Sequence, residues 1–212
     1  MATALQICNS ALIKLGAKTI SALTGLTTKE YDLCVAQYPR LRNAVLRNHT
    51  WAFAKIVDDA MTTAAAVALD EVWSYRHTLP TAVPIARIIS VTSLDDYPIP
   101  YERVGAYLYS NEETPRIRYV RSYTEVDDAA TFPDDFGEAL AALLAAEMAV
   151  SLTQNQSLRD TYLQQYQAAI SQARFNGAIE DADAPTVSEE WISSHQGFLP
   201  GIDPRLRGLE GY

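Results

Sequence analysis

Positive charge is scarce in this sequence of 212 residues. Lysine and arginine number 17 against 26 aspartate and glutamate residues, so the formal net charge at pH 7 is −9. Proteins that bind nucleic acid in general need a basic surface to neutralise the phosphates. The charge balance therefore argues against a general nucleic-acid-binding protein, and we expect double-stranded DNA near this chain to be repelled rather than held.

Motifs for catalysis and metal binding are also missing. The sequence contains neither a glycine-rich phosphate-binding loop nor a Gly-x-Ser-x-Gly nucleophile motif. Its three histidines, His49, His77 and His195, are far apart and have no cysteine or histidine at ligand spacing. We therefore expect no metal, no cofactor and no enzymatic activity.

Carboxylates, in contrast, are plentiful, and a glycosidase needs only two of them at the right separation in space. The candidates are Asp134 with Asp135, Asp127 with Asp128, and Glu147. A structural explanation fits each of them: the first pair caps a helix, the second lies in a linker, and Glu147 stands alone on an alanine-rich helix. The sequence leaves a glycosidase pair open without favouring one.

Cysteine and long apolar runs are rare. Cys8 and Cys34 both fall on apolar helix faces, which predicts buried free thiols rather than a disulfide. No apolar run is judged long enough to cross a bilayer, and Met1–Leu5 lacks the basic start of a signal peptide. We therefore expect no membrane partner and synthesis in the cytoplasm.

What the sequence does contain is a strong pattern for two helices between Phe132 and Gly177. Pro133, Asp134 and Asp135 are typical of a helix start. Apolar residues then recur every three or four positions, at Phe136, Leu140, Leu143, Leu144, Met148 and Leu152. Ser157 with Asp160 resembles a capping box for a second helix, which we expect to end at Gly177. The short loop predicts antiparallel neighbours, with the first helix buried at the centre.

Two further helices are predicted at the N-terminus. Thr3 can cap the first, and Gly16 can end it. Thr27 with Glu30 gives a capping box for the second, whose apolar stripe continues through Pro39. That stripe consists of Tyr31, Cys34, Tyr38, Leu41 and Val45. Beyond it, Trp51 and Phe53 are expected to pack in the core.

The far side of this second helix carries three arginines, Arg40, Arg42 and Arg47. A solvated face is the simplest interpretation. The alternative is contact with an acidic neighbouring subunit, which makes these residues candidates for a subunit interface.

Between the helical halves the sequence period changes to that of strands. The strand candidates are 72–77, 85–94, 101–109 and 116–123. The last carries Arg116, Arg118 and Arg121, with Arg103 expected opposite them. These four arginines form either a docking stripe or ordinary charge that protects an edge strand.

Beyond Gly177 an acidic linker leads into a segment with glycine and proline but no helical period. A disordered tail should contain few large apolar residues. This segment contains Trp191, Ile192, Phe198, Leu199, Leu206, Leu209 and Tyr212. It is therefore predicted to be an extended arm that binds another surface, or one that packs back on its own domain.

Together these patterns predict an α+β chain: an antiparallel helical bundle with a small antiparallel β-sheet inserted between its two halves, and an extended C-terminal arm. The expected boundaries are 1–56 for the first part of the bundle, 57–129 for the sheet, 130–179 for the second part of the bundle and 180–212 for the arm.

The succession of several segments resembles the head-to-tail adaptor family of tailed bacteriophages, the tail tubular protein A-like connectors of short-tailed phages. The residues that carry this resemblance are 38–42, 45–54, 73–80, 88–91, 119–120, 132–136 with the alanine- and leucine-rich helix that follows, and 158–173. Thr50 departs from the proline that relatives often have, and the C-terminal arm is not covered.

The resemblance implies a structural virion protein: a homo-oligomeric, dodecameric ring that joins the portal protein to the tail nozzle protein and surrounds the DNA channel. Under it the helical part faces the portal and neighbouring subunits, the sheet faces the nozzle, and the arm clasps the portal or an adjacent protomer. The location implied is the virion, after synthesis in the host cytoplasm. A phage-associated peptidoglycan hydrolase and a cytosolic helical protein-binding module remain the alternatives.

Overall fold

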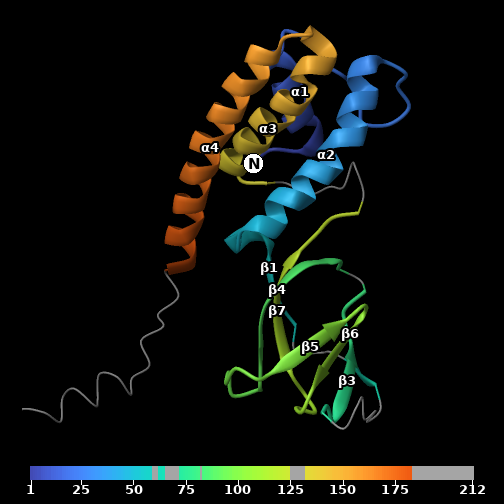
Figure 1. Ribbon diagram of the computed structural model, residues 1–212, viewed down its shortest axis with the longest axis vertical. Coiled ribbons are helices and arrows are strands. Elements are labelled where there is room, and N and C mark those ends of the chain that lie inside the picture. The colour runs from blue at the N-terminus through green and yellow to red at the C-terminus, as the bar shows by residue number, and fades with distance from the viewer. Residues whose placement is uncertain (59–61, 65–71, 82, 125–131, 183–212) are drawn as a thin grey trace, which may run out of the picture. The chain divides into compact units, whose positions relative to one another are not determined.

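The computed structural model describes residues 1–58, 62–64, 72–81, 83–124 and 132–182 (Figure 1). Its helices are α1 (Ala4–Lys14), α2 (Lys29–Asn48), the 3-10 turn η1 (Ala52–Ala54), α3 (Asp134–Thr153) and α4 (Gln156–Ala182). All described strands fall between α2 and α3 in the sequence, and all pair in antiparallel fashion. The predicted α+β class is confirmed.

Residues Met1–Glu180 form one compact unit, and Asp181–Tyr212 form a second. The second unit holds the predicted arm. Its seven proposed anchors lie outside the described residues: Trp191, Ile192, Phe198, Leu199, Leu206, Leu209 and Tyr212.

The first helix begins as its sequence predicts. The Thr3 backbone N–H donates to Gln6 Oε1 at 2.8 Å, and the Gln6 N–H donates to Thr3 Oγ1 at 3.3 Å, which completes a capping box. Gly16, with φ of +66°, follows the end of the helix. In α2 the cap is Thr28, one residue later than predicted, and its hydroxyl accepts from the Tyr31 N–H.

Helix α3 is the centre of the helical part. Eleven of its twenty residues are buried: Phe136, Gly137, Ala139, Leu140, Ala141, Ala142, Leu144, Ala145, Ala146, Met148 and Ala149. By length and composition alone α3 could cross a membrane, so the expectation that no run is long enough was wrong. The apolar composition of α3 is explained by its position in the core, because 61% of its most apolar stretch is buried inside the fold.

Helix α4 differs from its prediction at both ends. Asn155 rather than Ser157 supplies the cap, because Asn155 Oδ1 accepts from the Ser157 N–H at 3.0 Å. The helix then runs through Gly177 to Ala182. Gly177 is not among the glycines with positive φ, and the helix continues for five residues beyond it, so the prediction that Gly177 ends the helix was wrong.

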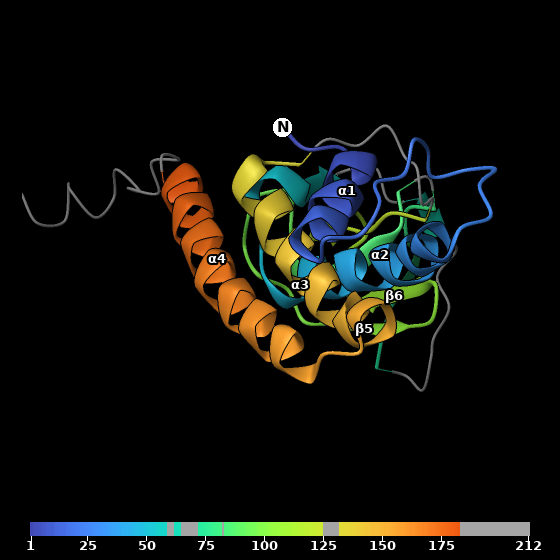
Figure 2. The ribbon, with the colours of Figure 1, turned by 90° about the horizontal axis from the view of Figure 1, so that it is seen from above.

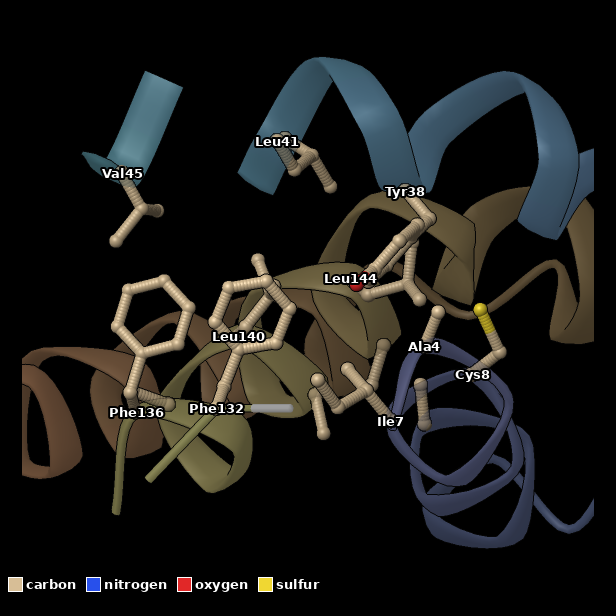
Figure 3. Packing of buried hydrophobic residues seen from close by; sticks show 14 of the residues in the cluster. Ala4, Ile7, Cys8, Tyr38, Leu41, Val45, Phe132, Phe136, Leu140 and Leu144 are labelled. Atoms are coloured by element: carbon tan, nitrogen blue, oxygen red, sulfur yellow. The ribbon is translucent and has the colours of Figure 1, made fainter. Parts of the chain in front are cut away.

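The core of the helical part brings α1, α2 and α3 together (Figure 3). An aromatic cluster joins the end of α2 to the start of α3, as expected for Trp51 and Phe53. The Trp51 and Phe53 rings each lie 5.0 Å from the Phe136 ring, and Phe53 lies 6.0 Å from Phe132. Cys8 and Cys34 are buried free thiols, as predicted.

The strands form two sheets, so the prediction of a single sheet was wrong. The first has the order β1 (Lys55–Asp58), β7 (Arg116–Arg121), β4 (Ile85–Thr92). The second has the order β2 (Thr62–Ala64), β3 (Tyr75–Thr78), β6 (Tyr107–Ser110), β5 (Tyr101–Val104).

The predicted strand at 101–109 is a hairpin because Gly105 and Ala106 form a two-residue turn between Val104 and Tyr107. The positive φ of Gly105, at the first turn position, is the pattern of a type II′ hairpin turn. A glycine inside a predicted strand was the available signal for this turn.

The contact between α1 and α3 is close enough to require glycine at one position. A Cβ placed on Gly137 would lie 2.8 Å from Ala2 Cβ. Ala2 cannot move away freely, because it exchanges two backbone hydrogen bonds with Phe132 at 2.8 and 3.0 Å.

We predict that Gly137→Ala lowers the free energy of unfolding by about 1–3 kcal/mol through overpacking, despite the better helix propensity of alanine. Gly177→Ala is the matched control, since no atom of a described residue lies within 4 Å of its added methyl group. It should stabilise the protein by up to about 1 kcal/mol. Denaturant unfolding measures both variants, and a stabilised Gly137→Ala would show that the contact is not tight.

Candidate functional site

The three arginines predicted on one face of α2 lie in different environments. Arg42 is fully buried, whereas Arg40 and Arg47 are exposed. The prediction that Arg42 lies on a solvated or subunit-contacting face was therefore wrong. Its guanidinium carbon lies 5.3 Å from the Tyr38 ring centre and 5.1 Å from that of Tyr123, within the range of cation–π attraction.

Hydrogen bonds fix this buried arginine to the segment after β7. Arg42 Nη2 donates to the Tyr123 carbonyl at 2.8 Å, and Asn43 Nδ2 donates to the same oxygen at 2.9 Å. Asn43 Oδ1 accepts from the Tyr123 N–H at 3.4 Å. These contacts tie α2 to the chain leaving the first sheet. The spacing of four residues between Tyr38 and Arg42 is a signal that Arg42 lies on the apolar side of the helix, but it does not indicate the contact with Tyr123.

Arg40 and Arg47 remain at the surface. Arg40 Nη2 lies 3.2 Å from Glu147 Oε2 and 2.7 Å from Gln37 Oε1. Glu147 thus pairs with a cation across the α2–α3 contact. Arg47 makes no ion pair with any described residue.

The four arginines of the strands do not form one stripe. Arg116 and Arg118 both bind Asp96 Oδ1, at 3.1 and 3.0 Å, so one carboxylate of the β4–β5 connection pairs with two guanidinium groups. Arg121 lies over the Tyr123 ring at 4.3 Å. Their strand β7 is the middle strand of its sheet, so they do not protect an edge.

Arg103 is not opposite these arginines. It lies in β5 at the edge of the second sheet and pairs in register with Leu108. The expectation of a shared stripe was therefore wrong for Arg103, which is exposed and donates from Nε to the Gly105 carbonyl at 3.4 Å.

Among the described carboxylates considered for glycoside hydrolysis, Asp135 and Glu147 are not paired across a cleft. Asp135 and Glu147 stand twelve residues apart on the same helix, which separates them by about 18 Å along its axis. Glycosidase pairs are about 5–9.5 Å apart. Asp135 instead accepts hydrogen bonds from the backbone N–H of Phe136, the next residue, at 2.8 Å and from Asn176 Nδ2 at 3.0 Å. Asp127 and Asp128 lie outside the described residues.

The second sheet contains a serine–histidine pair that the sequence did not suggest. His77 Nε2 lies 3.2 Å from Ser110 Oγ and 3.0 Å from the Glu112 carbonyl. Both residues have zero exposure, and His77 Nδ1 is buried with no hydrogen-bond partner among the described residues. A nucleophile must be reached by its substrate, so this pair serves as an internal hydrogen-bonded contact between β3 and β6.

Other surface features are a groove and several exposed apolar side chains. The groove, about 360 Å³ in volume, lies between α1 and α3, with Ile7 and Gly137 in its lining and Asp134 and Glu138 beside them. The exposed side chains include Phe175 and Ile179 of α4, which are 62% and 53% exposed. Within the described parts of the chain, no group of three or more His, Cys, Asp or Glu side chains gathers as a metal site would require.

Comparison with known proteins adds no family to these observations. No protein-family model matches the chain, and no curated protein matches it.

Arg42 is expected to contribute to stability, although it carries a charge. Arg42→Ala should lower the free energy of unfolding by about 2 kcal/mol or more, since packing between two rings and a hydrogen bond are lost together. Arg47→Ala, five residues further along the same helix, should change it by less than about 0.5 kcal/mol. Thermal and denaturant unfolding test both variants. Equal, small effects would mean that the Arg42 contacts contribute little.

His77 makes stability depend on pH. Burial lowers the pKa of His77, so below about pH 6.5 the unfolded chain binds a proton that the folded chain does not. Its contribution is complete above that pH and is lost as the pH falls. Burial and the nearby Arg174 and Arg87 lower the pKa of His49 as well, so it acts in the same direction.

We predict that His77→Gln weakens the loss of stability between pH 7 and pH 5. One such proton accounts for at most about 1.4 kcal/mol per pH unit. His49→Gln serves as the comparison for the second histidine. Unfolding curves measured across this range decide the matter, and an unchanged slope in His77→Gln would contradict the assignment.

Proposed function

We propose that this chain is the subunit of a head-to-tail adaptor ring that joins a phage portal to the tail. The observation that carries the proposal is the convergence of the segments that resemble the adaptor family. Tyr38, Trp51, Phe132 and Phe136 come from three separate resembling segments, and all of them are buried in one core cluster. Part of the resemblance therefore rests on residues that determine the helical packing.

The one departure from the family pattern has a defined role in this chain. Thr50 Oγ1 accepts a hydrogen bond from Arg87 Nη2 at 2.5 Å. The bond connects the end of α2 to β4, and proline at this position would lack the hydroxyl group. A threonine here is thus compatible with the same arrangement of helix and strand.

In this proposal the helices form an antiparallel bundle that faces the portal and the neighbouring subunits, and the strand region faces the tail nozzle. The distribution of charge between the two helical halves supports a ring in which two different surfaces meet at each contact. Residues 1–56 hold seven lysines and arginines against two acidic residues, whereas residues 132–182 hold two against seven. Opposite net charges on two helical halves favour heterologous contact, in which one patch meets a different one.

The acidic balance of the whole chain supports a passage for DNA. A net charge of −9 repels phosphate, so a lumen built from many copies would let double-stranded DNA move without specific binding. Catalysis has no part in this role, and neither does a cofactor.

The decisive experiment mixes the purified full chain with portal rings of the same phage and images the product by electron microscopy. A ring of this protein stacked on the portal, with copies related by the portal axis, is the expected result. A small complex without a ring would favour the protein-binding module. Clearing of peptidoglycan in a zymogram, lost in Glu147→Ala, would favour the hydrolase.

The arm is proposed to clasp the portal or an adjacent protomer through its apolar residues. Deletion of residues 186–212 should therefore abolish attachment to portal-containing heads, while circular dichroism and thermal unfolding show a folded protein. A sedimentation assay of heads with labelled protein measures attachment. Undiminished binding by the truncated chain would assign the clasp to another segment.

A further inference from the structure

The outward side of α4 carries almost no charge. Between Asp160 and Glu180 the only charged residue in nineteen positions is Arg174, which is half-buried. Solvent-facing surfaces usually carry charge on about a quarter to a third of their residues. This helix therefore presents to solvent a surface whose composition is that of a covered one.

Five of the exposed residues fall on one line along the helix. Successive spacings of four, three, four and four residues connect Gln164, Ala168, Ser171, Phe175 and Ile179, here called the α4 stripe, and each of them is exposed. Phe175 stands about 200° around the helix from the buried Ala173, so the stripe faces away from the core. Small residues in its middle permit close approach of another helix, and its end offers two large apolar side chains.

Another exposed line lies on α2. It consists of Asp32, Ala36, Arg40, Ala44 and Arg47, here called the α2 stripe, again at spacings of three and four. Alanines alternate with arginines in it. Guanidinium groups are donors only, and glutamine side chains such as that of Gln164 supply carbonyl acceptors. Arg40 already binds Glu147 and Gln37, so Arg47, which makes no ion pair with any described residue, is the donor that this stripe offers to such an acceptor. The two stripes are thus complementary in size, and Arg47 adds a hydrogen-bond donor.

The stripes belong to different flanks of the helical part. Helix α4 meets α3 at Asp135 through Asn176, whereas α2 meets α3 at Glu147 through Arg40. Twelve residues on one helix correspond to a rotation of about 120°. Figure 2 shows α1 and α3 between α4 and α2. A single copy cannot bring its own two stripes together.

We propose that the α4 stripe of one copy packs against the α2 stripe of a second copy. The contact is heterologous, because each copy uses a different surface on each side, and repetition of such a contact gives a closed ring or an open filament. The inference rests on the proposed adaptor ring and names its lateral contact. The chain's own C-terminal arm is the alternative partner for the α4 stripe. Its net charge is negative, because residues 183–212 hold five acidic residues against two arginines, whereas the α2 stripe carries arginines.

Cysteine cross-linking tests which surfaces meet. Both native thiols are fully buried, so only the engineered cysteines are expected to form disulfides between copies. Ser171→Cys combined with Ala44→Cys should give, on oxidation, a ladder of dimers, trimers and larger species, in solution at high concentration or on portal rings. Leu94→Cys with Ala44→Cys controls for random collision. Dimers formed by Ser171→Cys alone would show that the α4 stripe binds itself, and absence of a ladder under both conditions would overturn the proposal.

A charge added to the α4 stripe distinguishes its two possible partners, the α2 stripe of a second copy and the acidic C-terminal arm. Opposite the arginines of α2, Ala168→Lys should weaken self-association at least tenfold in sedimentation analysis, whereas Ala168→Glu should not weaken it. Gln165→Lys adds the same charge about 60° around the helix from Ala168 and is the matched control. If Ala168→Glu is the weakening variant and Ala168→Lys is not, the acidic arm covers the stripe and the proposal is wrong.

The two levels of the proposal fail separately. A cross-linked ladder from a protein that never binds portal rings would remove the adaptor function and keep the lateral contact. A ring seen on the portal, without cross-links between positions 171 and 44, would keep the function and remove this contact.

Discussion

Close packing around α3 is the constraint on which the rest of the structure depends. Alanine fills much of its surface, so neighbouring helices approach closely and any added volume is felt at once. At Gly137 the approach of Ala2 leaves no room even for a methyl group. The same helix separates α4 from α2, and therefore determines that the surfaces offered to other molecules lie on different flanks of the bundle.

Polar side chains attach elements to one another, both inside the fold and at its surface. Arg42 joins a helix to the chain leaving a sheet, and Asp96 holds two arginines of one strand. The arginines predicted as interface candidates therefore divide into two groups. Some, such as Arg42 and Arg116, bind other elements of the fold, and others, such as Arg47, stay exposed at its surface.

The helices were predictable because each of their signals is local. Thr3, Gln6 and Gly16 specify α1 within fourteen residues, and the apolar period of α3 is visible without any partner. The errors came from information that the local sequence does not hold. Nothing near Arg42 indicates that Tyr123, eighty-one residues later, will cover it. Strand order is likewise a long-range property, so the central position of β7 and the separation of Arg103 from Arg116 could not be deduced.

The bridge between Ala2 and Phe132 has a consequence for how the protein is made. Helices α1 and α2 leave the ribosome long before α3, the partner against which they bury their apolar sides. At roughly 5–20 residues per second, the delay before α3 appears lasts several seconds. During that time the first fifty residues expose apolar surface, and the strands can pair ahead of them. The beginning of the polypeptide is therefore among the last parts to reach its final place, and its exposed apolar surface is where a chaperone would bind during synthesis.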